Sequence, residues 1–541
     1  MNIHFKPLVY SALAIFLLFG CGSVQPGIIS TPVENIDAMP IKVTDLSDAQ
    51  KKNWSHLDLV RDTIPGMSVD KAYEEIIKNK KGQTTIVAII DSGIDIDHED
   101  LKKVIWTNPK EIANNGKDDD GNGYIDDIHG WNFLGDGYNE QLEYVRLLAS
   151  GDTSNPRYAE AQKLYNEAYQ KNLGNKTQYE QIMQQVNAAD DAVSKYLKKK
   201  VYTKDEVSAI KTEDAALQQA VATIKMVYGY GFDDVSKFKK ELNDGLEHFT
   251  EQLNYNLNKD LKGRKTGDNP NVLNDKPGYG NGNIKPSVKT ESHGTHVAGI
   301  IAAERKNGKG VDGVANNVKI MVVRTVPNGD EYDKDVANAI RYAVDNGAKV
   351  INGSFGKSFS PHAQWVYDAI KYASDKDVVI VVASGNDGEN LDQKDSFPND
   401  AVKNGNEVSN TFISVGSLES VYGSKLISSF SNYGKINIDV FAPGGQIYSP
   451  SPGNEYEFVN GTSFASPGVA GLAALIRSQY PSLKAAQVKD IILKSGLPLT
   501  TKVIVGGDPK NVQSFTNLST SGRIANTYNA LIMASEVAKK K

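Results

Sequence analysis

Residues 84–95 read TTIVAIIDSGID, a run of apolar β-formers that ends at an aspartate followed by small residues. Similar apolar runs recur along the chain, with helical patterns such as 333–346 and 361–375 between several of them. These runs are 318–323, 350–352, 378–383, 412–415 and 438–441. Near-continuous apolar strands that alternate with helices are typical of a parallel sheet covered by helices on both faces. The sequence therefore predicts an α/β fold, with function at the carboxyl ends of the strands.

Three short motifs each place a reactive side chain beside small residues. Asp91 follows the first strand in Asp-Ser-Gly, His293 begins His-Gly-Thr-His, and Ser463 lies in Gly-Thr-Ser-Phe-Ala-Ser-Pro. Taken singly, Asp91 could cap a helix, His293 could be a buried histidine and Ser463 could be an N-cap. Together they supply a nucleophile, a general base and a carboxylate that orients the base. The combination predicts nucleophilic catalysis.

The chain resembles the subtilisin-like serine proteases (subtilases) over most of 82–538, with these motifs in the order Asp, His, Ser and with Phe464 where the family usually has Met. The resemblance implies a three-layer fold with a mainly parallel sheet between helices, and a triad of Asp91, His293 and Ser463. It also implies that Asn386, in Ala-Ser-Gly-Asn-Asp-Gly, is the oxyanion donor. The N–H of Ser463, at a predicted helix start, would complete the anion site.

The same resemblance places substrate binding at Ser354, Phe355 and Gly356, a strand-end segment that pairs with an extended substrate and walls its first specificity pocket. Asp387 would lie at the floor or rim of that pocket, where it could favour a basic residue or be a solvated turn aspartate. The implied function is a serine endopeptidase that acts through an acyl-enzyme. The alternative is an inactive binding lipoprotein on a subtilase fold.

A second chemical feature lies between Asp91 and His293, where residues 114–127 read NNGKDDDGNGYIDD. The order of oxygen-bearing residues repeats that of a calcium loop, so we expect a structural calcium ion. The twelfth position is His129 in place of the closing Glu, so the loop is not an EF-hand and Asp127 is an alternative ligand. A solvated acidic turn is the competing interpretation. The candidate ligands are Asp118, Asp120, Asn122, Tyr124 and Asp126.

A further calcium candidate comes only from the resemblance. Asp100 and Asn307 lie near positions that share a calcium ion in many subtilases, although Lys309 in the same loop argues against a cation there.

The spacing of the triad departs from the family, because Asp91 and His293 lie 202 positions apart where a few tens are usual. We therefore predict a helical insertion at 136–287, between two parts of the catalytic domain at 69–135 and 288–541. A pair of helical hairpins packed on the rim is expected, and a role as lid or partner surface is a hypothesis. The predicted helix starts are the capping boxes Thr177–Glu180 and Thr203–Glu206, Asn155-Pro156 and Asp233-Asp234.

The first residues resemble the signal peptide of an exported bacterial lipoprotein. A positive start and an apolar stretch at 8–19, too short to span a bilayer, lead to Leu-Phe-Gly-Cys at Cys21. We predict a signal peptide at 1–20, a lipid on Cys21, a tether and N-terminal extension at 21–68, and a place in the cell envelope at the outer membrane. The alternative is a plain secretory signal with an incidental cysteine. Cys21 is the single cysteine, so no intramolecular disulfide can form.

The composition limits the partners. The 541 residues carry 60 Lys and Arg against 66 Asp and Glu, a net charge of −6, which gives no basic footprint for nucleic acid. The expected partners are protein or peptide substrates and, through the lipid, a membrane; the sequence predicts no oligomeric state.

Overall fold

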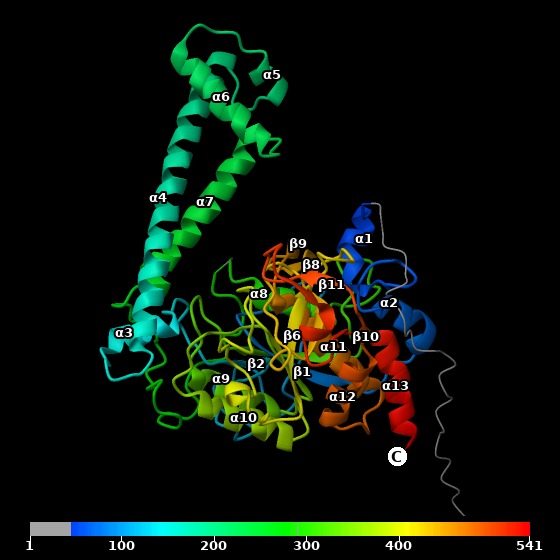
Figure 1. Ribbon diagram of the computed structural model, residues 1–541. Helices are drawn as coiled ribbons and strands as arrows, with labels where there is room; N and C mark the ends of the chain where they lie inside the picture. The colour runs from blue at the N-terminus through cyan, green and yellow to red at the C-terminus, as the bar shows by residue number, and fades with distance from the viewer. Residues whose placement is uncertain (1–44, 289, 541) are drawn as a thin grey trace, which may run out of the picture.

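The computed structural model describes residues 45–288 and 290–540 (Figure 1). The predicted signal peptide and lipidation residue Cys21 lie outside the described residues. Among the described helices, none is both long enough and apolar enough to cross a membrane.

A nine-stranded sheet lies at the centre of the body. Its strands are β1 (Thr85–Asp91), β2 (Gly130–Asn132), β3 (Val318–Arg324), β4 (Val350–Gly353), β5 (Val379–Ala383), β6 (Phe412–Leu418), β7 (Val440–Pro443), β10 (Leu497–Pro498) and β13 (Arg523–Ile524). The order is β10-β13-β7-β6-β5-β4-β1-β3-β2, and the pairs from β13 to β2 are parallel while β10 runs antiparallel to β13. Two antiparallel hairpins stand apart, formed by β8 (Ile447–Ser451) with β9 (Glu455–Val459) and by β11 (Lys502–Ile504) with β12 (Val512–Ser514). The predicted α/β fold with a mainly parallel sheet is confirmed.

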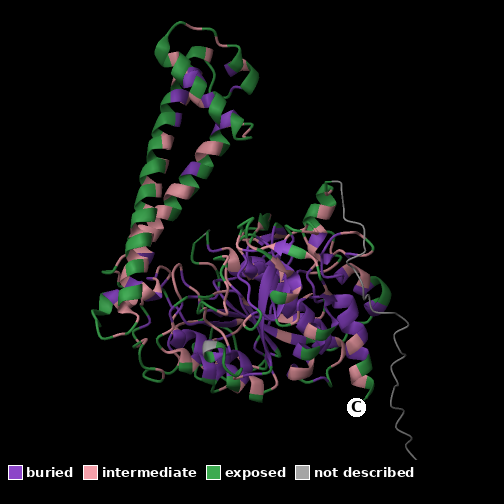
Figure 2. Cartoon of the chain, in the orientation of Figure 1, coloured by how far each residue is buried: buried purple, intermediate pink, exposed green. Residues whose placement is uncertain are grey.

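Helices cover both faces of this sheet, which explains why its strands are apolar at successive positions. Val87 and Ile89 of β1 belong to the core shared with one helical layer, whereas Ala88 and Ile90 belong to the core on the opposite face. The first layer contains α2 (Val69–Ala72), α8 (His293–Ala302), α11 (Thr462–Gln479), α12 (Ala485–Ser495) and α13 (Thr527–Lys539), and the second contains α9 (Asp333–Asp345) and α10 (Ala363–Asp375). Figure 2 shows the resulting buried centre. Since alternate side chains of a strand face opposite ways, both faces must be apolar.

A helical arm projects from the body (Figure 1). It is formed by α3 (Glu143–Ser150), α4 (Tyr158–Leu197), α5 (Lys204–Ser208), α6 (Ala215–Gly229) and α7 (Val235–Glu251). Helix α4 has 40 residues and is therefore about 60 Å long. Its outer half packs on α6 through a separate apolar core that includes Val186, Val193 and Ile224. The expectation that these helices pack on the rim is correct only for the base of the arm, where Leu148 and Ala161 pack with Phe359. The outer part projects from the body, because its apolar faces are buried against one another.

The predicted helix starts in the arm have mixed outcomes. Thr203 forms the expected capping box with Glu206, and Asp234 caps α7. The start at Thr177 is wrong, because Thr177 lies inside α4 and its hydroxyl donates to the carbonyl oxygen of Leu173, one turn earlier (2.9 Å). A Ser or Thr three residues before Glu occurs inside helices as well as at their starts, and nothing before Thr177 breaks the helix.

The segment after the arm returns along the body. Tyr279 is buried in the core under α9, and the indole N–H of Trp131 donates to the carbonyl oxygen of Tyr279 (2.9 Å). The backbones of Asn132 and Asn281 bond to each other in both directions, at 2.9 and 3.0 Å. The two ends of the arm segment therefore lie side by side next to the sheet.

Candidate active site

Asp91 and His293 meet at the carboxyl end of the sheet. Asp91 is the last residue of β1 and is 1% exposed, and His293 is the first residue of α8. The imidazole Nδ1 of His293 lies 2.7 Å from Oδ1 of Asp91, which also accepts the N–H of Ser92. Burial opposes the charged imidazole, but the charge and hydrogen bond of Asp91 outweigh it and raise the pKa of His293 above 6.5. Asp91 thus orients the histidine and stabilises its protonated form.

Ser463 lies in the first turn of α11. The helix follows Gly461, whose φ of 153° and ψ of 155° form a conformation that only glycine adopts readily. The hydroxyl of Ser463 donates to the carbonyl oxygen of Ser354 (3.2 Å), and the hydroxyl of Ser354 donates to the carbonyl oxygen of Ser463 (2.8 Å). No hydrogen bond joins Ser463 to His293, although the next residue, Phe464, places its ring 5.3 Å from the His293 ring. In unliganded active sites this catalytic bond is often absent or long.

Asn386 is oriented by a neighbour of Ser463. It follows β5, and its amide oxygen accepts both the backbone N–H and the hydroxyl of Thr462, at 2.8 and 2.9 Å. Since the oxygen is occupied by two donors, the amide N–H groups of Asn386 are directed away from Thr462 and remain available to an anion. Thr462 also accepts the N–H of Gly385 (3.1 Å). Sequence reasoning missed Thr462, although its place between Gly461 and Ser463 in the serine motif was a signal.

A cleft of about 630 Å³ is lined by Ser463, Thr462 and Asn386. Phe355, Gly356 and Asp387 line it as well. Ser354 instead lies below the cleft, where it is 3% exposed and holds Ser463. The base of the arm also lines the cleft, through Arg157, Glu160 and Leu164.

A buried ion cluster joins the substrate segment to the arm. The ammonium of Lys357, next to Gly356, lies 2.8 Å from Glu143 of α3 and 2.9 Å from Asp333 of α9. Burial alone would raise the pKa of Glu143, but Arg146 and Lys357 lower it to about 2. Sequence reasoning missed this cluster, because its members are far apart along the chain.

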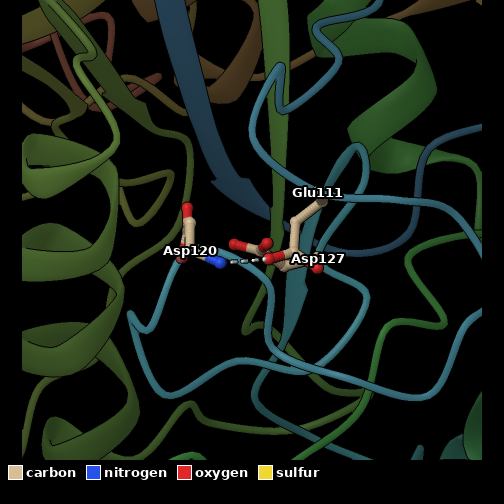
Figure 3. Close-up of side chains that lie close together, drawn as sticks. All are labelled: Glu111, Asp120 and Asp127. Atoms are coloured by element: carbon tan, nitrogen blue, oxygen red, sulfur yellow. Dashed lines mark hydrogen bonds between the residues drawn. The ribbon is translucent and has the colours of Figure 1, made fainter.

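An acidic cluster lies at the predicted calcium loop, and it combines the predicted ligand Asp120 and the alternative ligand Asp127 with Glu111 from before the loop. Glu111, Asp120 and Asp127 lie close together, with one carboxylate oxygen of each within 4.8 Å of the others (Figure 3). Oε2 of Glu111 is buried with no hydrogen-bond partner among the described residues. Burial, reinforced by the charge of Asp120, raises the pKa of Asp127 in spite of three hydrogen bonds to its carboxylate. This crowding suits a cation bound between the three carboxylates.

The other predicted ligands have different contacts. The carboxylate of Asp118 accepts backbone N–H groups of its own turn, and that of Asp126 accepts the N–H groups of Asn115 and Gly116. The amide of Asn122 donates to Asp127 (3.1 Å), and the Tyr124 ring packs on Trp131, Phe133 and Tyr342. Of the five predicted ligands, Asp120 alone belongs to the cluster.

Asp100 and Asn307 also lie together. The amide N–H of Asn307 donates to one carboxylate oxygen of Asp100, and the other oxygen accepts from Tyr456 (2.9 Å) and Val311 (3.2 Å). Lys309 pairs with Glu99 beside them. Both oxygens of Asp100 therefore face donors, an arrangement that does not fit a cation.

Comparison with known proteins gives consistent results. The family model described as "Subtilase family" matches residues 82–522. The chain is similar to "Thermophilic serine proteinase" of Bacillus sp. (strain AK1), 43% identical over 35% of this chain and 43% of that protein. It is similar to "Cell wall-associated protease" of Bacillus subtilis (strain 168), 34% identical over 50% of this chain and 28% of that protein. It is also similar to "Thermitase" of Thermoactinomyces vulgaris, 38% identical over 41% of this chain and 70% of that protein. The matched region thus spans less than half of the first two relatives.

Proposed function

This chain belongs to the subtilase family, and on that premise we propose that it is a serine endopeptidase with Asp91, His293 and Ser463 as its triad. The observation that carries the proposal is a pre-oriented Asn386 beside Ser463 in one cleft, together with an Asp91–His293 bond whose imidazole lies against Phe464, the residue after Ser463. An inactive binding protein would have no need of an amide donor fixed next to the serine.

The proposed reaction is acyl transfer to water. Ser463 Oγ attacks the carbonyl carbon of the scissile peptide while His293 Nε2 takes its proton, and Asp91 stabilises the imidazolium. The N–H groups of Asn386 and Ser463 stabilise the oxyanion. His293 then gives its proton to the leaving amine, and water repeats the sequence on the acyl-enzyme.

Labelling with a fluorophosphonate tests the proposal directly, since the probe reacts only with an activated serine. Intact protein should carry one label, found by peptide mapping on Ser463. A protein that is folded and remains unlabelled would favour the alternative of an inactive binding lipoprotein.

We propose that calcium binds the cluster of Glu111, Asp120 and Asp127 and acts structurally by neutralising these carboxylates. Support comes from their proximity, from the unpartnered oxygen of Glu111 and from the raised pKa of Asp127.

Calcium should raise the melting temperature, and chelator should lower it. At about 100 times its dissociation constant, the ion would add about 2.7 kcal/mol to the free energy of unfolding. Glu111→Gln with Asp120→Asn should abolish the calcium shift, measured by calorimetry. Asp119→Asn is the matched control, because Asp119 lies beside Asp120 but outside the cluster, and it should keep the shift. Equal melting temperatures in chelator and in millimolar calcium would contradict the proposal.

We also propose that the arm selects substrates, because its base forms one wall of the cleft. The base is anchored there by Arg157, which donates to the carbonyl oxygen of Ser358 (2.9 Å) and lies 3.7 Å from the centre of the Phe359 ring. A bulky substrate that reaches Ser463 must pass this wall, as it must pass a lid in other enzymes.

Shortening the arm tests this role while keeping its base. Tyr179 of α4 and Gly245 of α7 are in contact, so residues 181–243 can be replaced by a short Gly/Ser linker. We expect unchanged kcat/KM on small chromogenic peptides and altered cleavage of folded proteins. Identical rates on both substrate classes in a folded variant would dismiss the selecting role.

We further propose that the protein is exported and anchored by a lipid on Cys21, at the outer membrane. The support is the apolar stretch that ends in Leu-Phe-Gly-Cys. Mass spectrometry of the mature N-terminus should find acylated Cys21, and Cys21→Ser should move the protein from the membrane to the soluble fraction. An unmodified Cys21 in the mature protein would contradict the anchor.

A further inference from the structure

Glu291 lies two residues before His293 and is buried. Both of its carboxylate oxygens accept hydrogen bonds. Oε1 accepts the N–H of Gly93 (2.7 Å), and Oε2 accepts the N–H of Ser287 (2.6 Å). Gly93 is two residues after Asp91. One side chain thus joins the turn that carries Asp91 to the segment that carries His293.

Arg324 completes this arrangement from the neighbouring strand. It is the last residue of β3, directly opposite Asp91 in the parallel register. Its guanidinium binds Glu291 as a fork, with Nε 2.7 Å from Oε1 and Nη2 3.1 Å from Oε2. The side chains are 0% and 2% exposed for Arg324 and Glu291. A planar fork to a carboxylate fixes direction as well as distance.

The pair also contacts the entry to the arm segment. Nη1 of Arg324 lies 3.3 Å from Oδ1 of Asn132, and Asn132 is bonded through its backbone to Asn281. The chain therefore leaves and re-enters the body beside the ion pair, and the 201 residues between Asp91 and His293 include both the arm and Glu291.

We propose that Glu291 and Arg324 are positioning residues that hold the Asp91 turn and the His293 segment in the register needed for catalysis. In a chain with a short connection, the connection itself could limit the distance between the two residues. Here the connection is long, and the buried fork with its bond to Gly93 supplies the constraint. The inference rests on the proposed peptidase function.

The experiment separates the effect of the hydrogen bond between Glu291 and Gly93 from the effect of the buried charges of Glu291 and Arg324. In the background of Arg324→Met, which removes the cation, Glu291→Gln keeps an acceptor for the N–H of Gly93 while Glu291→Met does not. Both double variants bury no net charge and have similar volumes, so both are expected to fold. Fluorophosphonate titration counts active sites, and kcat, KM and the acid limb of kcat/KM are measured for each variant.

We expect the double variant Glu291→Gln with Arg324→Met to keep most of kcat. The variant with Met at both positions should lose roughly 10²-fold in kcat with little change in KM, as misplacement of a catalytic group by about 1 Å can do. The acid limb of kcat/KM for this variant should also move to lower pH. Asp91 is what raises the pKa of His293, and the other titratable neighbour, His296, carries a pKa lowered to about 4 by burial and stays neutral over this range.

Arg264→Met is the control for a structural effect alone. Arg264 is part of a separate buried ion cluster with Asp335 and Asp268, which contains no residue of the triad. This variant should lower the melting temperature without moving the acid limb or kcat per active site. Equal kcat and equal acid limbs in the two double variants would overturn the inference. An inactive wild-type protein would instead overturn the proposed function.

Discussion

Ser463→Ala is expected to abolish peptide-bond hydrolysis, with kcat falling about 10⁶-fold. In subtilisin, a member of this family, loss of the triad serine costs about 2 × 10⁶ in kcat, and the residual rate comes from the oxyanion site and binding. The change removes one oxygen at the start of α11 and leaves the core of the helix in place. The measurement is kcat on a chromogenic peptide, with circular dichroism and melting temperature to show that the fold is retained.

Ser478→Ala provides the matched control. Ser478 lies near the other end of α11, is 1% exposed, and its hydroxyl has no hydrogen-bond partner among the described residues. The control carries the same chemical change in the same helix, away from the cleft, and should keep full activity. If cleanly purified Ser463→Ala turned over peptide like the control, the serine would not be the nucleophile.

The fold was predictable from the sequence because its signals are local. The apolar run that ends at Asp91 becomes β1, and the run that ends near Ala383 becomes β5, each within one residue of its predicted start. Strands buried on both faces must be apolar throughout, and few other structures need such runs. The arm was less predictable, because the capping pattern at Thr177 is equally compatible with the interior of α4. How the arm leaves the body depends on contacts among its own helices and on contacts of its base with residues 357–359, and no local pattern encodes either set.

Some residues of the candidate site could likewise be predicted from local sequence, whereas others could not. Asp91, His293, Ser463 and Asn386 each stand in a short motif, so the amino-acid sequence alone is enough to propose them as site residues. Three other residues of the site could not be identified in this way. Thr462 and Lys357 act through partners that are distant in sequence, and Glu111 lies outside the acidic loop 114–127. Glu111 shows the difference most clearly: the loop 114–127 contains the conspicuous acids, yet several of these bind backbone N–H groups, and a residue before the loop completes the cluster.

Asn386→Ala is expected to lower kcat about 10²- to 10³-fold with little change in KM. The amide donates to an oxygen that carries full charge only in the tetrahedral intermediate, so its loss raises the barrier more than it weakens substrate binding. The asparagine is exposed at the cleft and packs little of the core, so stability should be almost unchanged. Steady-state kinetics on one peptide, corrected by active-site titration, gives both constants. A rise in KM with unchanged kcat would assign Asn386 to substrate binding alone.

Thr462→Val tests whether Asn386 is active because of its orientation. The substitution removes the hydroxyl that bonds to the Asn386 amide oxygen at 2.9 Å and keeps the backbone N–H that bonds to it at 2.8 Å. The loss in kcat should therefore be smaller than that of Asn386→Ala. In the double variant the two losses should not add, because without the amide Thr462 has nothing to orient. Full additivity would mean that Thr462 acts on the reaction by a route that does not pass through Asn386.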